Sequence, residues 1–435
     1  MPPVTVLSFR QKFRRCFRWC RITSLFLVLL LLGGLVYLNR VGLPEFLKLR
    51  LVSELRSRGV ALNFTRLRLR WYHGLVAENI SLGRADDPVG PHLSVGQADI
   101  KLDLAALRHL RLHVNSLRLH EGRLVLPLIS SNGPPEQFVV NSIMTELRLL
   151  PQDRWELDHF QAFCLGGKIN LSGALANASA VRDWQFARGT NQPLGLWQTQ
   201  LRQAVKIARQ MRFGRPPEIM VTVNGDAGVP ASISVDLRFR AREADTSWGK
   251  LEKLLLIARL NQPSGSNDTG RSELKLQLDD ARTPWGNLKL SRSYLYWAQS
   301  FSNPMPMEAN VDWELFEVST PWGEIPQARF SGRSHQSPDG SGRLHSELML
   351  ASGVFQSEWF QLRTNRFTAQ LVHSPDSLLP EQTDWQWQVD RPQSRWGQAR
   401  DYQLDGRATR APAESQPQAD ASWCWWAALE PFIID

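Results

Sequence analysis

The sequence predicts a mostly β protein, in which an N-terminal transmembrane helix precedes an elongated, curved antiparallel β-meander with a few amphipathic helices. Three observations favour this fold class. A tryptophan recurs every 37 residues, at Trp248, Trp285, Trp322, Trp359 and Trp396. A fixed period of this length is typical of a repeat architecture. Apolar and polar residues alternate around each of these tryptophans, and we find no helix-forming segment in residues 250–435.

Each repeat is predicted to contain two antiparallel strands. An alternating stretch precedes the tryptophan, as in residues 273–278, and a second extended run follows it, as in residues 287–297. Glycine follows four of the five tryptophans, and the exception is Trp359-Phe360. Because glycine permits positive φ, the Trp-Gly pair marks the short connection between strands, and its indole can cover the apolar face of the sheet.

Stacked repeats would give a long sheet with one apolar face. No helix is predicted to cover that face, so it either closes on itself as a core or stays open as a trough. An apolar wall of this kind would solvate alkyl chains. The candidate lipid-binding residues, taken from the alternating runs, are Leu274, Leu276, Leu278, Leu288, Leu290, Val311, Trp313, Leu315, Trp385, Trp387 and Val389.

The N-terminus carries a basic cluster followed by an uncharged apolar run. Much of the net charge of +9 comes from residues 10–21, so it marks a membrane flank rather than a nucleic-acid site. The run Ile22 to Leu38 is either a transmembrane segment or a signal peptide. Since no Ala-x-Ala cleavage site follows, we favour a retained anchor with residues 1–21 in the cytoplasm.

A short amphipathic helix is predicted directly after the anchor, from Pro44 to Gly59, because proline suits the first turn and glycine the C-terminal end. One interpretation places this helix at the membrane surface, where the basic residues available to meet lipid headgroups are Lys48, Arg50, Arg56 and Arg58. The alternative is an ordinary amphipathic helix packed on a sheet, and the two interpretations are compatible.

Further strands follow, and their motifs resemble a known family. They include Gly-Leu-Val-Ala-Glu-Asn-Ile at 74–80, Arg-Leu-His-Val-Asn-Ser-Leu-Arg-Leu at 111–119 and Leu-Gly-Gly-Lys-Ile-Asn-Leu-Ser-Gly at 165–173. Together with the anchor and its helix, this order is similar to the N-terminal region of AsmA/TamB-like proteins of bacterial envelopes, over about residues 20–180.

The resemblance implies a taco-like β-groove of the bridge-like lipid transfer type. It also implies a single-pass protein of the bacterial inner membrane, with a cytoplasmic N-terminus and its bulk in the periplasm. Such a groove carries phospholipid acyl chains toward the outer membrane, or otherwise assists envelope assembly.

The predicted organisation has five parts. The boundaries are a basic flank at 1–21, the anchor at 22–43, an AsmA-like helix and sheet at 44–190, a capping helix at 191–214 and the repeats at 215–435. The next Trp-Gly would fall near residue 433, so the final repeat is predicted to be cut in mid-unit.

Catalytic and metal-binding motifs are not found in the sequence. His109 and His113 lie in a run of alternating leucines, and in a strand their side chains would be about 13 Å apart, too far to share an ion. There is no Gly-x-Ser-x-Gly, phosphate-binding loop or paired-cysteine zinc spacing. We therefore expect no enzyme activity, no cofactor, no metal and no nucleic-acid partner.

The leading functional hypothesis is a membrane-anchored periplasmic groove that binds phospholipid acyl chains. A second hypothesis is a protein-interaction scaffold, which would engage an outer-membrane β-barrel or another envelope protein through a sheet edge. A glycan hydrolase comes third, because no paired carboxylates indicate one.

Overall fold

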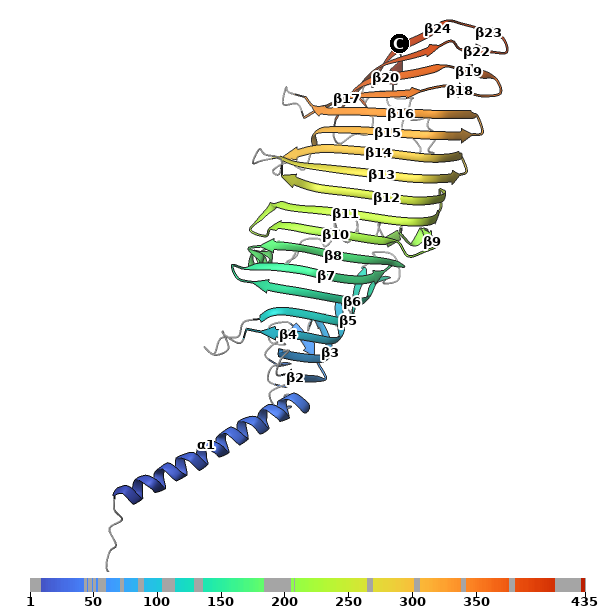
Figure 1. The fold of residues 1–435 in the computed structure, drawn as a ribbon. Helices are drawn as coiled ribbons and strands as arrows, with labels where there is room; N and C mark the ends of the chain where they lie inside the picture. The colour runs from blue at the N-terminus through green and yellow to red at the C-terminus, as the bar shows by residue number, and fades with distance from the viewer. Residues whose placement is uncertain are drawn as a thin grey trace, which may run out of the picture. The chain divides into compact units, whose positions relative to one another are not determined.

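A computed structural model of the chain describes residues 9–42, 45, 49, 52–53, 60–70, 74–84, 90–103, 114–128, 136–183, 205–206, 208–263, 269–300, 306–337, 342–374, 380–410 and 432–434. The chain divides into two compact units, Met1–Leu150 with Asp158–Ala162 and Pro151–Leu157 with Phe163–Asp435. This division falls near residue 150, whereas the sequence suggested a boundary at 191–214. Both units are built mainly from antiparallel strands, which confirms the predicted β-meander (Figure 1).

The first unit begins with one long helix and continues as a sheet. Strands β3, β4, β5 and β6 pair in sequence, while β1 and β2 both pair with β3. Alternation places small and β-branched side chains inside, among them Val76, Val95 and Ala98, each no more than 3% exposed. The elements are α1 (Phe9–Arg40), β1 (Val60–Asn63), β2 (Arg66–Arg70), β3 (Gly74–Arg84), β4 (His92–Leu102), β5 (Val114–Leu128) and β6 (Glu136–Leu150), with β7 (Arg154–Cys164) shared between the two units.

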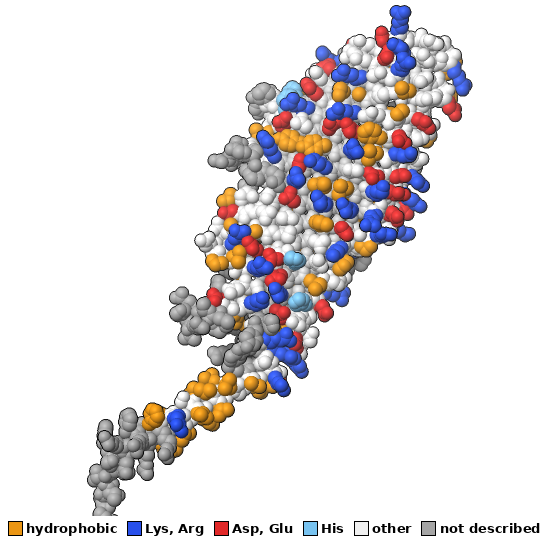
Figure 2. Space-filling model, viewed as in Figure 1, with side chains coloured by type: hydrophobic (Ala, Val, Ile, Leu, Met, Phe, Trp, Pro, Cys, Tyr) orange, Lys and Arg blue, Asp and Glu red, His pale blue; other side chains and the backbone are white. Residues whose placement is uncertain are grey.

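Helix α1 contains the apolar run that the sequence analysis interpreted as an anchor. Its described apolar side chains are exposed, for example Leu25 at 61% and Leu30 at 63%, and they follow one another along the helix in Figure 2. Within the described residues, no helix combines the length and the apolar character needed to cross a membrane.

The two predicted amphipathic helices lie mostly outside the described residues. Of the helix at 44–59, positions 45, 49, 52 and 53 are described, and all four are helical. Of the capping helix, residues 205–206 and 208–210 are described as helical, and Val205 is only 1% exposed. That burial fits packing against the rest of the unit.

The second unit is a meander that contains one parallel step. Strands β8 and β10 pair in parallel over nine residues, from Lys168 opposite Glu218 to Ala176 opposite Asp226. From β10 onward the long strands pair antiparallel in sequence order. The elements are β8 (Gly167–Ala176), η1 (Ala178–Asp183), β9 (Arg212–Phe213), β10 (Glu218–Asp226), β11 (Val229–Thr246), β12 (Gly249–Pro263), β13 (Thr269–Thr283), β14 (Gly286–Ser300), β15 (Pro306–Thr320), β16 (Gly323–Gln336), β17 (Leu344–Ser352), β18 (Phe355–Gln356), β19 (Phe360–Leu362), β20 (Thr364–His373), β21 (Gln382–Asp390), β22 (Gln393–Ser394), β23 (Gly397–Gln398), β24 (Asp401–Arg410) and β25 (Phe432–Ile434).

The repeated tryptophans lie in the tight turns that join strands of one repeat, as predicted. In the second repeat, Thr283 pairs with Gly286, which leaves a loop of two residues. The Thr283 hydroxyl accepts a hydrogen bond from the Trp285 amide at 3.3 Å and donates one to the Gly286 carbonyl at 2.8 Å. The same pair of bonds recurs around Trp248, Trp322 and Trp396. A Thr or Ser hydroxyl thus closes each of these turns.

Glycine follows the tryptophan because the next repeat approaches its backbone closely. A Cβ added at Gly249 would lie 2.1 Å from the Arg282 carbonyl oxygen, and one at Gly286 would lie 2.3 Å from that of Ser319. Both glycines have positive φ, at 136° and 150°. Consecutive turns are therefore packed backbone to backbone, which only glycine permits.

The tryptophans themselves do not cover the apolar face. Their exposed fractions are 50% for Trp248, 59% for Trp285, 70% for Trp322, 62% for Trp359 and 80% for Trp396. An indole that covered the apolar face would be buried against it, so these exposed fractions contradict the expected covering role.

Candidate functional site

Strand register gives the second unit two chemically different faces. On one face, cross-strand neighbours form continuous apolar rows, because side chains directly opposite each other in paired strands share a face. The first row runs through Ile169, Ile219, Phe239, Leu256, Leu276, Ser293, Trp313, Phe330, Leu350, Phe367, Trp387 and Leu404. The second runs through Leu171, Val221, Leu237, Ala258, Leu274, Leu295, Val311, Gly332, Leu348, Ala369, Trp385 and Gly406. We call these two rows the apolar face.

The apolar face is only partly shielded from solvent. Trp313, Leu350 and Leu404 are 42%, 41% and 40% exposed, and most other members are half-buried by their neighbours. The rows cross twelve strands, which corresponds to roughly 50 Å at the usual strand spacing. Exposed apolar patches of this extent mark interaction surfaces rather than ordinary protein surface.

Two of the indole N–H groups on this face are hydrogen-bonded to side chains of a neighbouring row. The indole N–H of Trp313 donates to the Ser291 hydroxyl at 2.7 Å, and that of Trp387 donates to the Asn365 side-chain oxygen. Both tryptophans therefore offer their rings without an unsatisfied donor. An apolar ligand would meet no desolvation cost from these two groups.

Most of the sequence-predicted groove residues lie on this face. Leu276, Trp313 and Trp387 belong to the first row, and Leu274, Val311 and Trp385 to the second. Leu278, Leu315 and Val389 lie beside them in a third row that also contains Ser291, Ala328, Ser352, Asn365 and Tyr402.

Leu288 and Leu290 were expected in the same groove, but the register places them on the opposite face. Leu290 pairs with Asp279, whose carboxylate accepts a hydrogen bond from Gln277 at 3.1 Å. Leu290 also precedes Ser291, which opposes Leu278, so alternation directs the two side chains to different faces. The expectation is therefore wrong for these two leucines.

The opposite face of the sheet is polar and charged, and we call it the polar face. Arg259 lies 2.8 Å from Glu273, Arg333 lies 3.3 Å from Glu308, and an Arg329 nitrogen lies 2.5 Å from Asp312. The guanidinium of Arg407 bonds Asp384 and lowers the pKa of that carboxyl. Side chains of both signs are interspersed over the strands of this unit in Figure 2.

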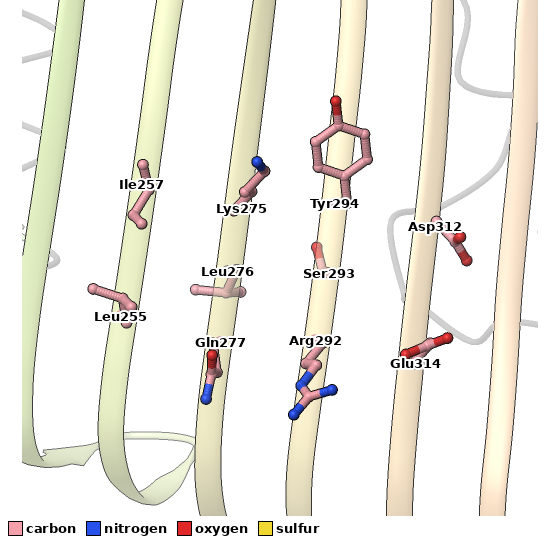
Figure 3. Close-up of a pocket in the computed structure, with 10 residues that line it drawn as sticks. All are labelled: Leu255, Ile257, Lys275, Leu276, Gln277, Arg292, Ser293, Tyr294, Asp312 and Glu314. Atoms are coloured by element: carbon pink, nitrogen blue, oxygen red, sulfur yellow. The ribbon is translucent and has the colours of Figure 1, made fainter.

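A shallow hollow of about 360 Å³ lies on the polar face, across β12 to β15 (Figure 3). Its aliphatic side is formed by Leu255 and Ile257, and Lys275, Arg292 and Glu314 bring charge to it. The Lys275 ammonium lies 5.3 Å from the centre of the Tyr294 ring. Because its charges are of both signs, the hollow matches no single class of charged ligand.

A larger hollow, of about 700 Å³, lies between the repeat that departs from Trp-Gly and residues 392–399 of the next repeat. Phe360, which replaces the glycine, packs against Phe355 with their ring centres 5.3 Å apart. Leu362 and Trp387 join them, so this hollow adjoins the first apolar row. Phe355, Phe360 and Leu362 were not among the sequence-predicted groove residues. The only local signal for them is the departure from Trp-Gly at Trp359-Phe360.

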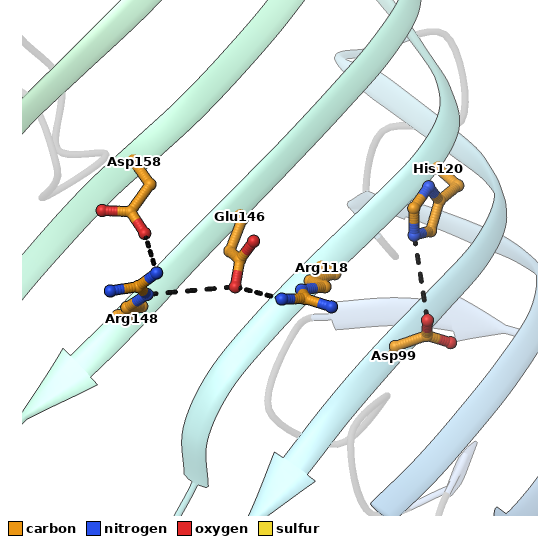
Figure 4. A network of polar contacts seen from close by, with 6 residues as sticks. All are labelled: Asp99, Arg118, His120, Glu146, Arg148 and Asp158. Carbon is orange, nitrogen blue, oxygen red and sulfur yellow. Dashed lines mark hydrogen bonds and ion pairs between the residues drawn. The ribbon is translucent and has the colours of Figure 1, made fainter. Parts of the chain in front are cut away.

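The first unit carries its own network of charges (Figure 4). Arg118 donates to Glu146 at 2.7 Å, and Arg148 lies 2.6 Å from Asp158 and 3.9 Å from Glu146. The hydrogen bond from Arg118 holds the pKa of the Glu146 carboxyl below its ordinary value. The same bond raises the pKa of the Arg118 guanidinium.

Replacing Glu146 with glutamine is expected to destabilise the first unit by about 0.5 kcal/mol at neutral pH, because the pair is partly exposed. A lowered pKa stabilises the fold above the ordinary carboxyl value of 4.5, and this contribution is lost as the pH falls through the lowered value. The difference between wild type and Glu146→Gln should therefore shrink below pH 4.5 in urea titrations. A difference that stays constant down to pH 2.5 or so would contradict this account.

The remaining predicted positions give no further site. Lys48, Arg50, Arg56 and Arg58 lie outside the described residues, as do His109 and His113. Within the described part of the chain, no group of three or more His, Cys, Asp or Glu is placed to hold a metal ion.

Comparison of the chain with protein-family models, curated proteins and solved structures finds no match. The candidate site is an apolar surface backed by a charged one.

Proposed function

We propose that this protein binds the acyl chains of phospholipids along the apolar face of its second unit. The observation that carries the proposal is the pair of uninterrupted cross-strand rows, in which Ser293 is the only side chain with a polar group that is not an indole N–H. Each CH₂ group transferred from water to such a surface gains about 0.8 kcal/mol. Aliphatic contacts are unspecific, so a bound chain can slide along the rows.

Membrane attachment through α1 forms part of the proposal. Its apolar side chains are exposed, such as Phe26 at 64% and Leu29 at 59%, and a continuous apolar surface of this kind is unfavourable in water. The resemblance of residues 20–180 to AsmA/TamB-like proteins agrees with this combination. It suggests an inner-membrane protein with a taco-like periplasmic groove that assists lipid transport or outer-membrane assembly.

Site-specific photo-crosslinking tests the proposal. A photo-crosslinking amino acid at position 276 or 367 should capture phospholipid from vesicles, because both positions belong to the first apolar row. The same amino acid at 277 or 368, one residue along each strand, faces the polar side and serves as the matched control. Equal capture from both faces, or capture from the polar face alone, would contradict the proposal.

A protein-interaction scaffold is the second candidate, and one observation favours it. Among the described residues, the outer side of β24 pairs only with β25, from Ala408 to Arg410. The preceding part of β24 therefore presents backbone groups that a partner strand can pair with. Partner binding of this kind should survive a charge placed on the apolar face, whereas lipid binding should not.

A further inference from the structure

Five exposed tryptophans line one edge of the second unit, and we call them the tryptophan edge. They are Trp248, Trp285, Trp322, Trp359 and Trp396. Their turns lie at the same ends of successive strand pairs, as Figure 1 shows. Successive tips are two strands apart, so the indoles recur at roughly 10 Å and span about 40 Å.

Packing within the fold does not account for these indoles. Each turn is already closed by a Thr or Ser hydroxyl, for example Thr320 at the Trp322 turn. Among the described residues, none of the five indole N–H groups has a hydrogen-bond partner, unlike those of Trp313 and Trp387. At least half of every one of the five side chains remains in solvent.

Comparison of the five turns within the chain shows which position is fixed. The hydroxyl residue is Thr in three turns and Ser in two, and the residue before tryptophan is Ser247, Pro284, Pro321, Glu358 or Arg395. Even the glycine is replaced once, by Phe360. Tryptophan alone never changes, although a large exposed indole contributes little to the turn itself.

We propose that the tryptophan edge rests in the interfacial region of a lipid bilayer. Tryptophan is the side chain most typical of that region, because its ring is apolar while its N–H can bond headgroups or water. Apart from tryptophan, Phe360 and Arg395 are the only residues of the tips that belong to the types enriched in protein interfaces. Glu358 and Arg395 give the row charges of both signs, which fits a zwitterionic surface better than a polyanion.

The fixed turns also make the edge suited to this role. The backbone bonds at each tip and the close packing of Gly249 and Gly286 against the next repeat hold the indoles in a preorganised line. This inference extends the proposed function, since an edge seated in a bilayer would let acyl chains pass sideways onto the adjoining apolar face.

Crosslinking of the full chain on phosphatidylcholine vesicles tests the edge directly. A photo-crosslinking amino acid in place of Trp285 or Trp322 should yield at least about tenfold more lipid adduct than one in place of Arg292 or Arg329 on the polar face. Raising the ionic strength should leave the yield unchanged, because the tips carry no single sign of charge. Adducts with a second copy of the chain, or a yield equal to that at the polar-face positions, would overturn the inference.

A Leu276→Glu background separates this inference from the proposed function. Adducts from the edge should persist there while adducts from the apolar face are lost. If the edge adducts disappear together with those of the face, the edge does not bind the bilayer by itself and the inference fails. If the unaltered chain forms adducts at the tryptophan edge but never at the apolar face, the proposed function fails while the inference about the edge stands.

Discussion

Replacing Gly286 with alanine is expected to lower the free energy of unfolding of the second unit by roughly 2–3 kcal/mol. The new Cβ would lie 2.3 Å from the Ser319 carbonyl oxygen, which belongs to the next repeat and is part of its backbone. Neither the φ of 150° at this glycine nor the packed carbonyl can adjust without separating two strands. Urea denaturation followed by far-ultraviolet circular dichroism measures the loss.

Gly397 provides a control within the same chain. It occupies the equivalent place after Trp396, but its φ is outside the positive range of Gly286, and a Cβ there would meet nothing within 4 Å. Gly397→Ala should therefore change stability by less than about 0.5 kcal/mol. If both variants lose equal stability, neither the positive φ of Gly286 nor the approach of the next repeat explains the loss.

Leu276→Glu is expected to reduce phospholipid capture by the second unit at least tenfold or so, because a carboxylate in an apolar row must be desolvated when a chain covers it. Leu276 lies in the first row with Leu256 and Ser293 as its cross-strand neighbours. Binding of a fluorescent or radiolabelled phospholipid to the purified chain gives the measurement.

Leu290→Glu is the matched control, since it makes the same chemical change on the other face. Leu290 lies opposite Asp279 and Phe316 in the paired strands. We expect this variant to keep at least half or so of the wild-type capture, given that nearby charges already occupy the polar face. Equal loss in the two variants would indicate a general effect on folding and would remove support for a binding face.

The sequence was sufficient to predict the meander and its turns. Alternation of apolar and polar residues gives strands, and the 37-residue interval between tryptophans gives the length of one strand pair with its two connections. The Trp-Gly pairs indicated the short connections between strands, because glycine permits positive φ. The parallel step between β8 and β10 had no such local pattern, since it depends on pairing across a long connection.

The composition of each face could be predicted only in part. In β14 the apolar residues change position within one strand, from Leu288 and Leu290 to Leu295 and Trp297. Leu288 and Leu290 are even-numbered whereas Leu295 and Trp297 are odd-numbered, so alternation places the two pairs on opposite faces. Leu290 pairs with Asp279, whereas Leu295 pairs with Val311 and so joins the apolar rows. This pairing register is a property of the folded sheet and cannot be read from one strand.

Long-range contacts of the candidate site also lay beyond sequence reasoning. The hollow beside Phe360 depends on Trp387, which approaches from another strand. The Arg329–Asp312 pair likewise joins residues of adjacent strands. Such contacts follow from register and not from local pattern.

The two-strand size of the repeat has a consequence for how a protein of this kind can change in length. Duplication of one 37-residue segment in the gene would add an even number of strands, so the chain would leave the new unit in its original direction. Each duplication would extend the sheet of the second unit by roughly 10 Å. Insertion of an odd number of strands would instead reverse the direction of the chain, so that all later Trp turns would lie at the opposite edge of the sheet. Whole-repeat duplication is therefore the evolutionary step that lengthens this surface while leaving its chemistry intact.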